Sequence, residues 1–187
     1  MSPELFTFDR FLPLLDPDTF SDVAFYQELE KIGYRQVLLG GTGSAGLTDV
    51  VRAIRGATNI MRQGLPFVPV AYLIMGNSTA RWYFDAFLLP SNKILLGYAN
   101  YARMVGYRFL ALDYEDPEIN IDAGLIAALR KIPGLHLVIS DEFTPEGAAA
   151  ALGYGAQTVI TPSDIFEDAA DPLALAAEFH DRLLKRP

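Results

Sequence analysis

The sequence predicts an α/β fold of the TIM-barrel-like (βα) type, with about seven strand-helix units in a single domain, 1–187. Short apolar runs alternate with helical patterns along the whole chain, and no linker or shift in composition divides it. Nearly every apolar run also ends in polar or turn residues. Parallel strands that close into a barrel bring such residues together at one mouth, where active sites lie. An open doubly wound sheet, the alternative, would gather them at one switch point.

Local patterns predict the elements in chain order. The apolar run 12–16 precedes a helix that Ser21 is expected to cap and Gly33 to end. The other strands are expected over the apolar runs 35–40, 67–75, 85–91, 108–114, 135–140 and 158–163. The helices that follow them are expected over 48–61, 78–84, 94–106, 121–131, 144–155 and 172–185.

Composition excludes several classes of protein. A net charge of −8, with no basic stripe to offset it, argues against nucleic-acid binding. No apolar window is long enough to span a membrane, and the first residues do not resemble a signal peptide. The absence of cysteine fits the cytoplasm. Zinc sites built from cysteine or histidine are excluded, because the only histidines are His136 and His180. We therefore expect a cytoplasmic globular protein.

A glycine-rich turn follows the second predicted strand. Gly41, Gly43 and Gly46 have the G-x-G-x-x-G spacing of dinucleotide-binding loops. This turn does not follow the first strand, however, and the next strand lacks the terminal acid that would hold a ribose. A nucleophile elbow around Ser44 would need glycine at position 42, which is Thr42. Two interpretations stay open: a simple turn, or a site for an anion or a metal diphosphate.

The stretches LLDPDT, VLLGGTGSAGLTDVVRAI, VPVAYLIMGNSTARWYFDAFLLPSN and ILLGYANYARM resemble a known family. They are similar to the geranylgeranylglyceryl and heptaprenylglyceryl phosphate synthases, TIM-barrel prenyltransferases to which a moenomycin-pathway prenyltransferase is related. The likeness covers most of the chain and is strongest in its first half. It implies that Asp16 and Thr42 bind the Mg²⁺ that carries a prenyl diphosphate, and that the protein forms a homodimer. Mg²⁺ commonly takes few protein oxygens and leaves its other positions to phosphate and water.

The sequence departs from the family where the acceptor phosphate is expected. Leu14 replaces the lysine that contacts this phosphate, and LDYED (112–116) replaces L-E-Y-S-G. The glycine triplet falls on 140–142, and the last glycine-asparagine pair falls on 162–163. Carboxylates in place of glycine amides repel a phosphate, so we expect the glycerol phosphate site to be lost. The chain is also shorter than the family, and one βα unit, the family's fifth, is expected to be missing.

Substrate-binding candidates come from the glycine turn, one strand end and an aromatic cluster. We expect the substrate to contact Gly40, Gly41, Gly43, Tyr72, Trp82, Ser91 and Asn92. The aromatic side chains would line a channel for the isoprenoid chain or stabilise an allylic cation. The alternative for them is ordinary core packing.

These patterns predict a Mg²⁺-dependent enzyme that acts on a prenyl diphosphate. The predicted activity is prenyl transfer to a small-molecule acceptor without phosphate, with Asp113 or Asp141 as general base and Tyr114 positioning the acceptor. A terpene synthase and a non-catalytic binding barrel stay open as alternatives, because a fold alone does not fix chemistry. We also expect residues 115–118, Asp141 and Glu142 to form an acidic patch at the mouth that holds Thr42. The alternative is a solvated turn around Pro117.

Overall fold

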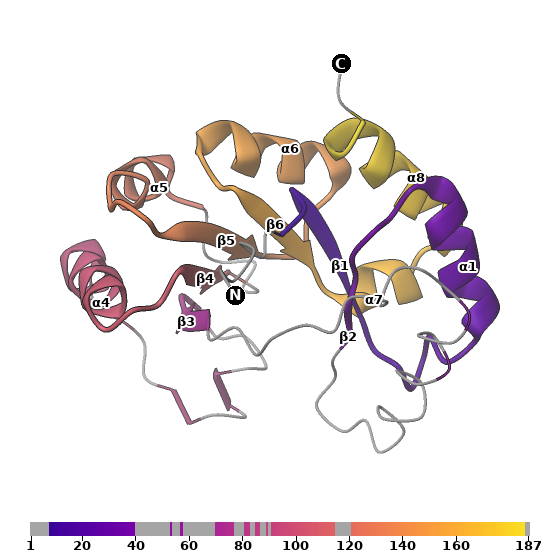
Figure 1. Ribbon diagram of the computed structural model, residues 1–187, viewed down its shortest axis with the longest axis horizontal. Coiled ribbons are helices and arrows are strands. Elements are labelled where there is room, and N and C mark those ends of the chain that lie inside the picture. The colour runs from indigo at the N-terminus through magenta and orange to yellow at the C-terminus, as the bar shows by residue number, and fades with distance from the viewer. Residues whose placement is uncertain are drawn as a thin grey trace, which may run out of the picture. The chain divides into compact units, whose positions relative to one another are not determined.

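The computed structural model in Figure 1 describes residues 8–39, 53, 57, 70–76, 81, 82, 85, 86, 89, 91–114 and 121–185. The chain divides into two compact units. The first consists of residues 1–64 and 161–187, and the second consists of residues 65–160. Within the described residues every paired strand is parallel to its neighbour, as the alternation of strands and helices predicts.

In the first unit, helices pack against a parallel pair of strands. Its elements are β1 (Phe11–Leu15), α1 (Val23–Ile32), β2 (Leu38–Leu39), α7 (Ser163–Glu167) and α8 (Pro172–Leu183). Helices α7 and α8 both contact β1, and α1 packs against α8. Phe11 of β1 stacks on Phe179 of α8 with ring centroids 4.5 Å apart, and both side chains are fully buried. Burial of aromatic side chains therefore stabilises the core of this unit.

The ends of α1 show where local prediction succeeds and where it fails. Gly33 ends the helix with a φ of 122°, a conformation that favours glycine, as predicted. The N-cap is Asp22 and not Ser21, because the Asp22 carboxylate accepts a 2.9 Å hydrogen bond from Ala24 N. Serine and aspartate cap helices about equally well, so the sequence alone could not choose between neighbouring candidates.

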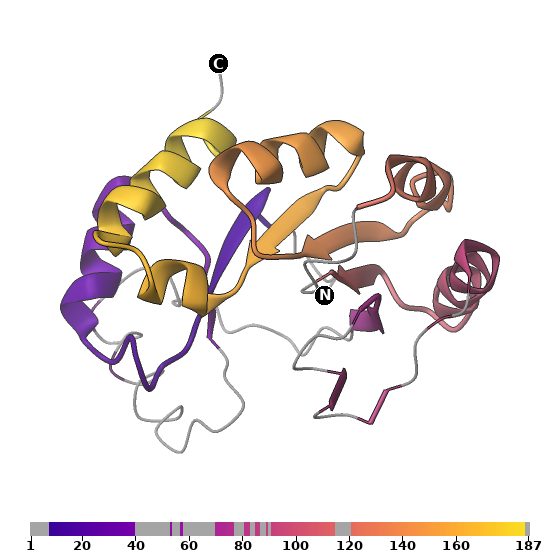
Figure 2. The ribbon, with the colours of Figure 1, turned by 180° about the vertical axis from the view of Figure 1, so that it is seen from behind.

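The second unit is built on a sheet with the strand order β6-β5-β4-β3. Its elements are β3 (Val70–Ile74), α4 (Asn92–Met104), β4 (Phe109–Asp113), α5 (Ala123–Leu129), β5 (His136–Ser140), α6 (Pro145–Tyr154) and β6 (Thr158–Thr161), which ends at the unit boundary. Figures 1 and 2 show α4, α5 and α6 side by side on one face of this sheet. A βα barrel places its helices on one face, whereas a doubly wound sheet has helices on both.

One predicted strand is not found between its expected neighbours. Strand β3 pairs directly with β4, with Val70 opposite Phe109, so the apolar run 85–91 does not separate them. Part of that run lies outside the described residues. Of its described positions, Asp85 is in a turn with a φ of 49°, and Ser91 is the N-cap of α4. The prediction of a strand over 85–91 is therefore wrong at these positions.

Strand β4 is buried along its whole length. All five of its residues are inaccessible, which is typical of a central strand in a parallel sheet. Asp113, its last residue, nevertheless carries a carboxyl group and is fully buried. Burying a carboxyl group is costly unless nearby groups compensate it, and such groups are common at functional sites, so the end of β4 is a candidate site.

Candidate functional site

The carboxyl ends of the strands in the second unit lie level with one another. Ile74 is opposite Asp113, Asp113 is opposite Ser140, and Ser140 is opposite Ile160. Because the strands are parallel, the residues that follow these positions emerge at one edge of the sheet. Strand pairing thus brings together residues that are far apart in the sequence.

The residues just beyond this row are held by further backbone hydrogen bonds. Tyr114 N donates to Ser140 O at 2.8 Å, and Asp141 N donates to Ile160 O at 3.2 Å. Ser140 itself is only 2% exposed. The predicted catalytic residues Asp113, Tyr114 and Asp141 therefore lie on two adjacent strand ends.

Asp141 is the acid whose titration the structure perturbs most clearly. Burial raises its pKa to about 6, and the negative charges of Glu142 and Asp113 add to this effect. A 2.9 Å hydrogen bond from Glu142 N to Asp141 Oδ1 acts in the opposite direction. A carboxylate with a pKa near 6 is mostly ionised at neutral pH and can still accept a proton, which suits a general base.

Tyr114 is almost completely buried, and burial raises its pKa to about 12. The negative charges of Asp122 and Asp141 contribute to this shift, and the nearby backbone N–H of Asp122 opposes it. Within the described residues its hydroxyl has no hydrogen-bond partner of good geometry. A buried hydroxyl usually has a partner, so this O–H is a polar group at the edge of the sheet whose hydrogen bonding the described residues do not fully satisfy.

Asp122, which the sequence analysis did not single out, links two helix starts at this edge. It caps α5 by accepting hydrogen bonds from Gly124 N and Leu125 N. The bond from Leu125 N lowers its pKa most, and Asn92, whose Nδ2 donates to Asp122 Oδ2 at 2.7 Å, contributes further. An aspartate directly before a helical pattern was the available signal.

The structure gives two predicted substrate-binding residues a role at a helix start. Ser91 caps α4 by accepting a hydrogen bond from Ile94 N, and Asn92 makes the bond to Asp122 described above. Tyr72 of β3 is 47% exposed. Trp82 is 74% exposed, with the Arg81 guanidinium 5.4 Å from the centre of its ring. Neither aromatic side chain is part of the core.

The predicted metal ligand Asp16 lies in the first unit, directly after β1. Its Oδ1 accepts a 2.8 Å hydrogen bond from Asp18 N, and its carbonyl oxygen accepts one of 2.8 Å from Phe20 N. These bonds form the turn that an aspartate before proline favours. Among the described residues, no group of three or more His, Cys, Asp or Glu side chains is arranged to hold a metal ion.

Several predicted positions lie outside the described residues. They are Gly40, Gly41, Thr42, Gly43 and the stretch 115–118. Of the predicted acidic patch, the structure describes Asp141, which is half-buried, and Glu142, which is exposed. Both follow β5 in the sequence, and the acidic patch itself stays a prediction because its other residues lie outside the described ones.

Parallel βα units with helices on one face and polar groups at the strand ends define a TIM-barrel-like α/β protein. Comparison with known proteins supports this fold class.

No family model matches the chain. A stretch of 98 residues is 30% identical to the geranylgeranylglyceryl phosphate synthase of Cenarchaeum symbiosum, and the match covers 50% of this chain and 40% of that protein. The matched region thus spans less than half the length of this curated relative.

Similar solved structures also indicate a TIM-barrel-like fold. The (S)-3-O-geranylgeranylglyceryl phosphate synthase of Thermoplasma acidophilum, in complex with its substrate sn-glycerol-1-phosphate, matches with a TM-score of 0.78 and 16% identity, over 94% of this chain and 93% of that one. The enzyme of Thermoplasma volcanium has the same score and identity, over 94% and 92%. The thiamine phosphate pyrophosphorylase of Pyrococcus furiosus reaches a TM-score of 0.62 at 12% identity, over 94% and 95%.

The sequence match and the strongest of these fold matches fall on the same group of proteins. The resemblance found in the sequence is therefore confirmed: the chain is similar to the geranylgeranylglyceryl phosphate synthases over part of its sequence, and it shares their TIM-barrel-like fold.

Proposed function

We propose that this chain is a prenyltransferase that joins a prenyl group from a prenyl diphosphate to a small-molecule acceptor without phosphate. The observation that carries the proposal is the pair of acids, Asp113 and Asp141, at adjacent strand ends. A related enzyme was solved with sn-glycerol-1-phosphate. Two carboxylates repel such an anion. A neutral acceptor molecule can instead donate a hydrogen bond or a proton to them.

The residues of this edge fit the proton transfer that the reaction needs. The acceptor's oxygen, nitrogen or carbon forms a bond to C1 of the prenyl group, and the C1–O bond to diphosphate breaks with its electron pair on the leaving oxygen. The acceptor's proton passes to the Asp141 carboxylate, whose pKa of about 6 suits this role. The Tyr114 hydroxyl, buried and neutral, donates a hydrogen bond that orients the acceptor.

We further propose that Asp16 and Thr42 hold Mg²⁺ together with the diphosphate. Mg²⁺ commonly binds one or two carboxylates plus phosphate oxygens and waters, so a single aspartate after β1 fits this ion. When bound, it neutralises charge on the leaving diphosphate. The role of Asp16 in this chain is to place one carboxylate at the end of a strand, in a turn that its own Oδ1 stabilises.

The test is a product analysis with Mg²⁺ and labelled geranyl, farnesyl and geranylgeranyl diphosphates. Each donor is incubated alone, with glycerol 1-phosphate, and with a panel of phosphate-free alcohols, phenols and amines. We expect a prenylated product only with a phosphate-free acceptor, and none from Asp141→Asn. A prenylglyceryl phosphate would contradict the acceptor assignment. Hydrocarbon or alcohol products from the donor alone would identify a terpene synthase, and no turnover of any donor would indicate a binding protein.

A further inference from the structure

The described acids of the second unit lie toward one of its ends. Each is the last residue of a strand, part of the segment that follows a strand, or in the first turn of the next helix: Asp85, Asp113, Asp122, Asp141, Glu142 and Glu146. The segments that run from a helix to the next strand, 103–108, 130–135 and 153–157, contain no acid. They carry four exposed basic residues instead: Arg103, Arg108, Arg130 and Lys131. This end of the unit is therefore basic, although the chain carries a net charge of −8.

Large apolar side chains are exposed at the same end. Met104 is 82% exposed, Val105 is 52% exposed, and Tyr101 in the last turn of α4 is 61% exposed. Exposed methionine and valine side chains in adjacent positions lose the favourable free energy of apolar burial. We name the seven residues Tyr101, Arg103, Met104, Val105, Arg108, Arg130 and Lys131 the basic-apolar surface.

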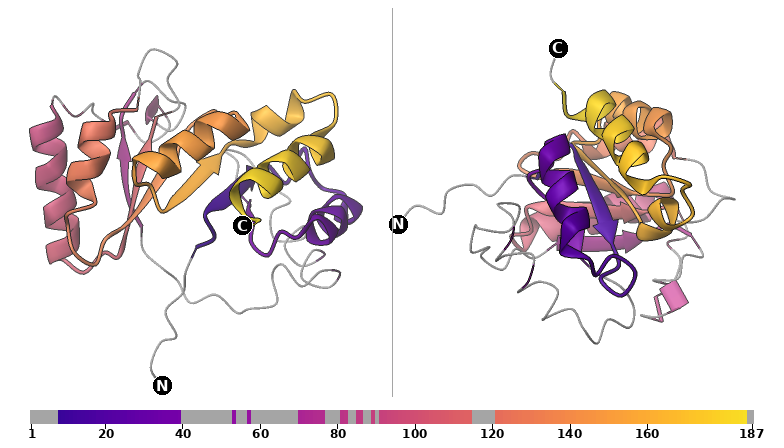
Figure 3. Two further views of the ribbon diagram at one scale, coloured as in Figure 1. Left: turned by 90° about the horizontal axis from the view of Figure 1, so that it is seen from above. Right: turned by 90° about the vertical axis from the view of Figure 1, so that its right-hand side faces the viewer.

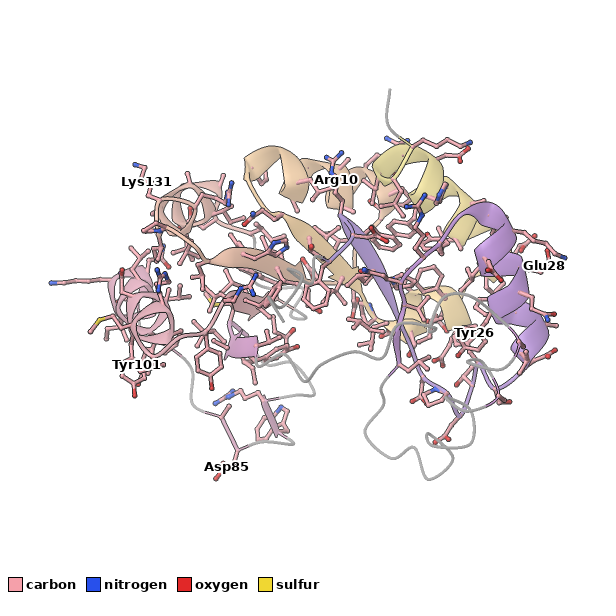
Figure 4. The ribbon with its side chains drawn as sticks, in the orientation of Figure 1. Arg10, Tyr26, Glu28, Asp85, Tyr101 and Lys131 are labelled. Atoms are coloured by element: carbon pink, nitrogen blue, oxygen red, sulfur yellow. The ribbon has the colours of Figure 1, made fainter. Side chains whose placement is uncertain are left out.

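A hydrogen bond joins the part of this surface at the end of α4 to the segment after α5. Arg103 Nε donates a 2.7 Å hydrogen bond to Pro133 O, which connects the end of α4 to the segment after α5. Figure 3 (left) shows α4 and α5 lying alongside each other, and the two helices are in contact. In Figure 4, Tyr101 projects from α4 and Lys131 from the segment after α5, toward opposite sides of this pair of helices. The Arg103 hydrogen bond thus places the end of α4, with its basic and apolar groups, next to the segment that carries Arg130 and Lys131.

We propose that the basic-apolar surface docks onto a membrane that contains anionic phospholipids. Basic side chains bind lipid phosphates, methionine and valine insert among the acyl chains, and tyrosine prefers the interface between them. The proposed contact is peripheral. None of the helices in the described part of the chain is long and apolar enough to cross a bilayer. The proposal does not depend on the prenyltransferase activity.

Charge and side-chain type favour a lipid surface over other occupants. A second copy related by a two-fold axis would bring the same basic residues face to face, which is repulsive. A nucleic acid would attract the basic groups but would leave Met104 and Val105 without an apolar contact. An anionic bilayer offers lipid phosphates to the basic side chains and acyl chains to the apolar side chains.

Vesicle flotation of the full chain, without any substrate, tests the proposal. The vesicles contain phosphatidylcholine with or without an equal amount of phosphatidylglycerol. We expect binding to the anionic vesicles, weakened by 0.5 M NaCl, and a loss of about tenfold or more in Arg130→Glu/Lys131→Glu. Met104→Ser/Val105→Ser keeps the basic groups but loses the two apolar side chains that insert among the acyl chains. It should therefore bind several-fold more weakly even at low salt.

A matched control carries the same change of charge elsewhere. Lys31→Glu/Lys185→Glu reverses two exposed lysines of the first unit, which pair with Glu28 and Asp181, and should bind as the wild type does. Circular dichroism verifies that each variant is folded. Failure of the wild type to bind anionic vesicles, or equal binding by all variants, would overturn the proposal. Duplex DNA binding that is lost only in Arg130→Glu/Lys131→Glu would also overturn it. So would a dimer, detected by ultracentrifugation, that is absent in Met104→Ser/Val105→Ser.

Discussion

The carboxylate of Asp113, at the end of β4, lies close enough to that of Asp141, after β5, for its negative charge to raise the pKa of Asp141. Asp113 is fully buried, and Asp141 is half-buried. Two interacting acids with different burial, at the carboxyl ends of parallel strands, are typical of sites that move protons.

Replacing Asp141 with asparagine should remove the proposed general base. We expect kcat/KM for prenyl transfer to fall by about 10²- to 10⁴-fold, the usual contribution of general-base catalysis. In the wild-type protein, activity should rise with pH around pH 6, since the base works in its ionised form and its pKa is about 6. Steady-state kinetics from pH 5 to 8 measures both effects. A variant that keeps the wild-type rate at pH 7 would exclude Asp141 as the base.

Glu142→Gln should move this pH profile without removing the base. The negative charge of Glu142 raises the Asp141 pKa, so its neutralisation should shift the midpoint of activity below pH 6. Glu146→Gln is the control, because Glu146 is also exposed and also follows β5 but does not contribute to the Asp141 pKa. Equal profiles for both variants and the wild type would contradict the electrostatic coupling.

The raised pKa also predicts how stability depends on pH. The folded pKa of Asp141 is above its ordinary value of 3.8, so the folded state is favoured by protonation. This contribution is fully present below pH 3.8 and is lost as the pH rises through about 6. Asp141→Asn should therefore be more stable than the wild type at pH 8, by about 1 kcal/mol after allowance for solvent screening, and equally stable near pH 3.5. Urea unfolding at the two pH values checks this difference.

Tyr114→Phe should separate a ligand-binding role from a structural one. Within the described residues the hydroxyl has no partner of good geometry, so its removal should leave the free energy of unfolding unchanged or slightly higher. If the hydroxyl binds the acceptor, KM for the acceptor should rise by about tenfold, equivalent to one hydrogen bond. Thermal unfolding and acceptor titration measure the two quantities. A clear loss of stability with unchanged KM would show a structural role only.

Asp16→Asn tests the metal site without disturbing the turn. The asparagine side-chain oxygen can still accept the hydrogen bond from Asp18 N, but the charge that Mg²⁺ needs is lost. We expect a folded protein with the thermal stability of the wild type and with turnover below detection. Chelation by EDTA should stop the wild-type enzyme, and added Mg²⁺ should restore it. Full activity of Asp16→Asn would exclude this residue as a metal ligand.

Elements with strong local signals were predicted closely. The apolar runs that became β4 and β5 end in the polar residues that the sequence marked, Asp113 and Ser140. Helix α6 lies within the predicted range 144–155: Thr144 caps it by accepting a hydrogen bond from Gly147 N, and Gly155, with a φ of 121°, ends it. Capping and turn formation depend on neighbouring residues, so the sequence contains the information.

The run 85–91 shows why other elements could not be predicted. It is apolar and ends in polar residues, yet β3 pairs directly with β4, and Ser91 starts a helix. An apolar run does not determine which strand it will pair with, because pairing depends on residues that are distant in the sequence. The strand predicted over 158–163 likewise ends at Thr161, and Ser163 begins the short helix α7, for which no element is predicted beyond that residue.

The sequence by itself determined the alternation of strands and helices and the acids that follow the strands, because periodicity and turn chemistry are local properties. Only the tertiary structure decided that Asp113 is fully buried, that its negative charge contributes to the raised pKa of Asp141, and that the Tyr114 hydroxyl is buried. It also placed Arg103 against the segment after α5, which unites the basic and apolar groups of two helix ends. Burial and charge proximity set pKa values and surface chemistry, and both arise from strand pairing and helix packing between segments that no local pattern relates.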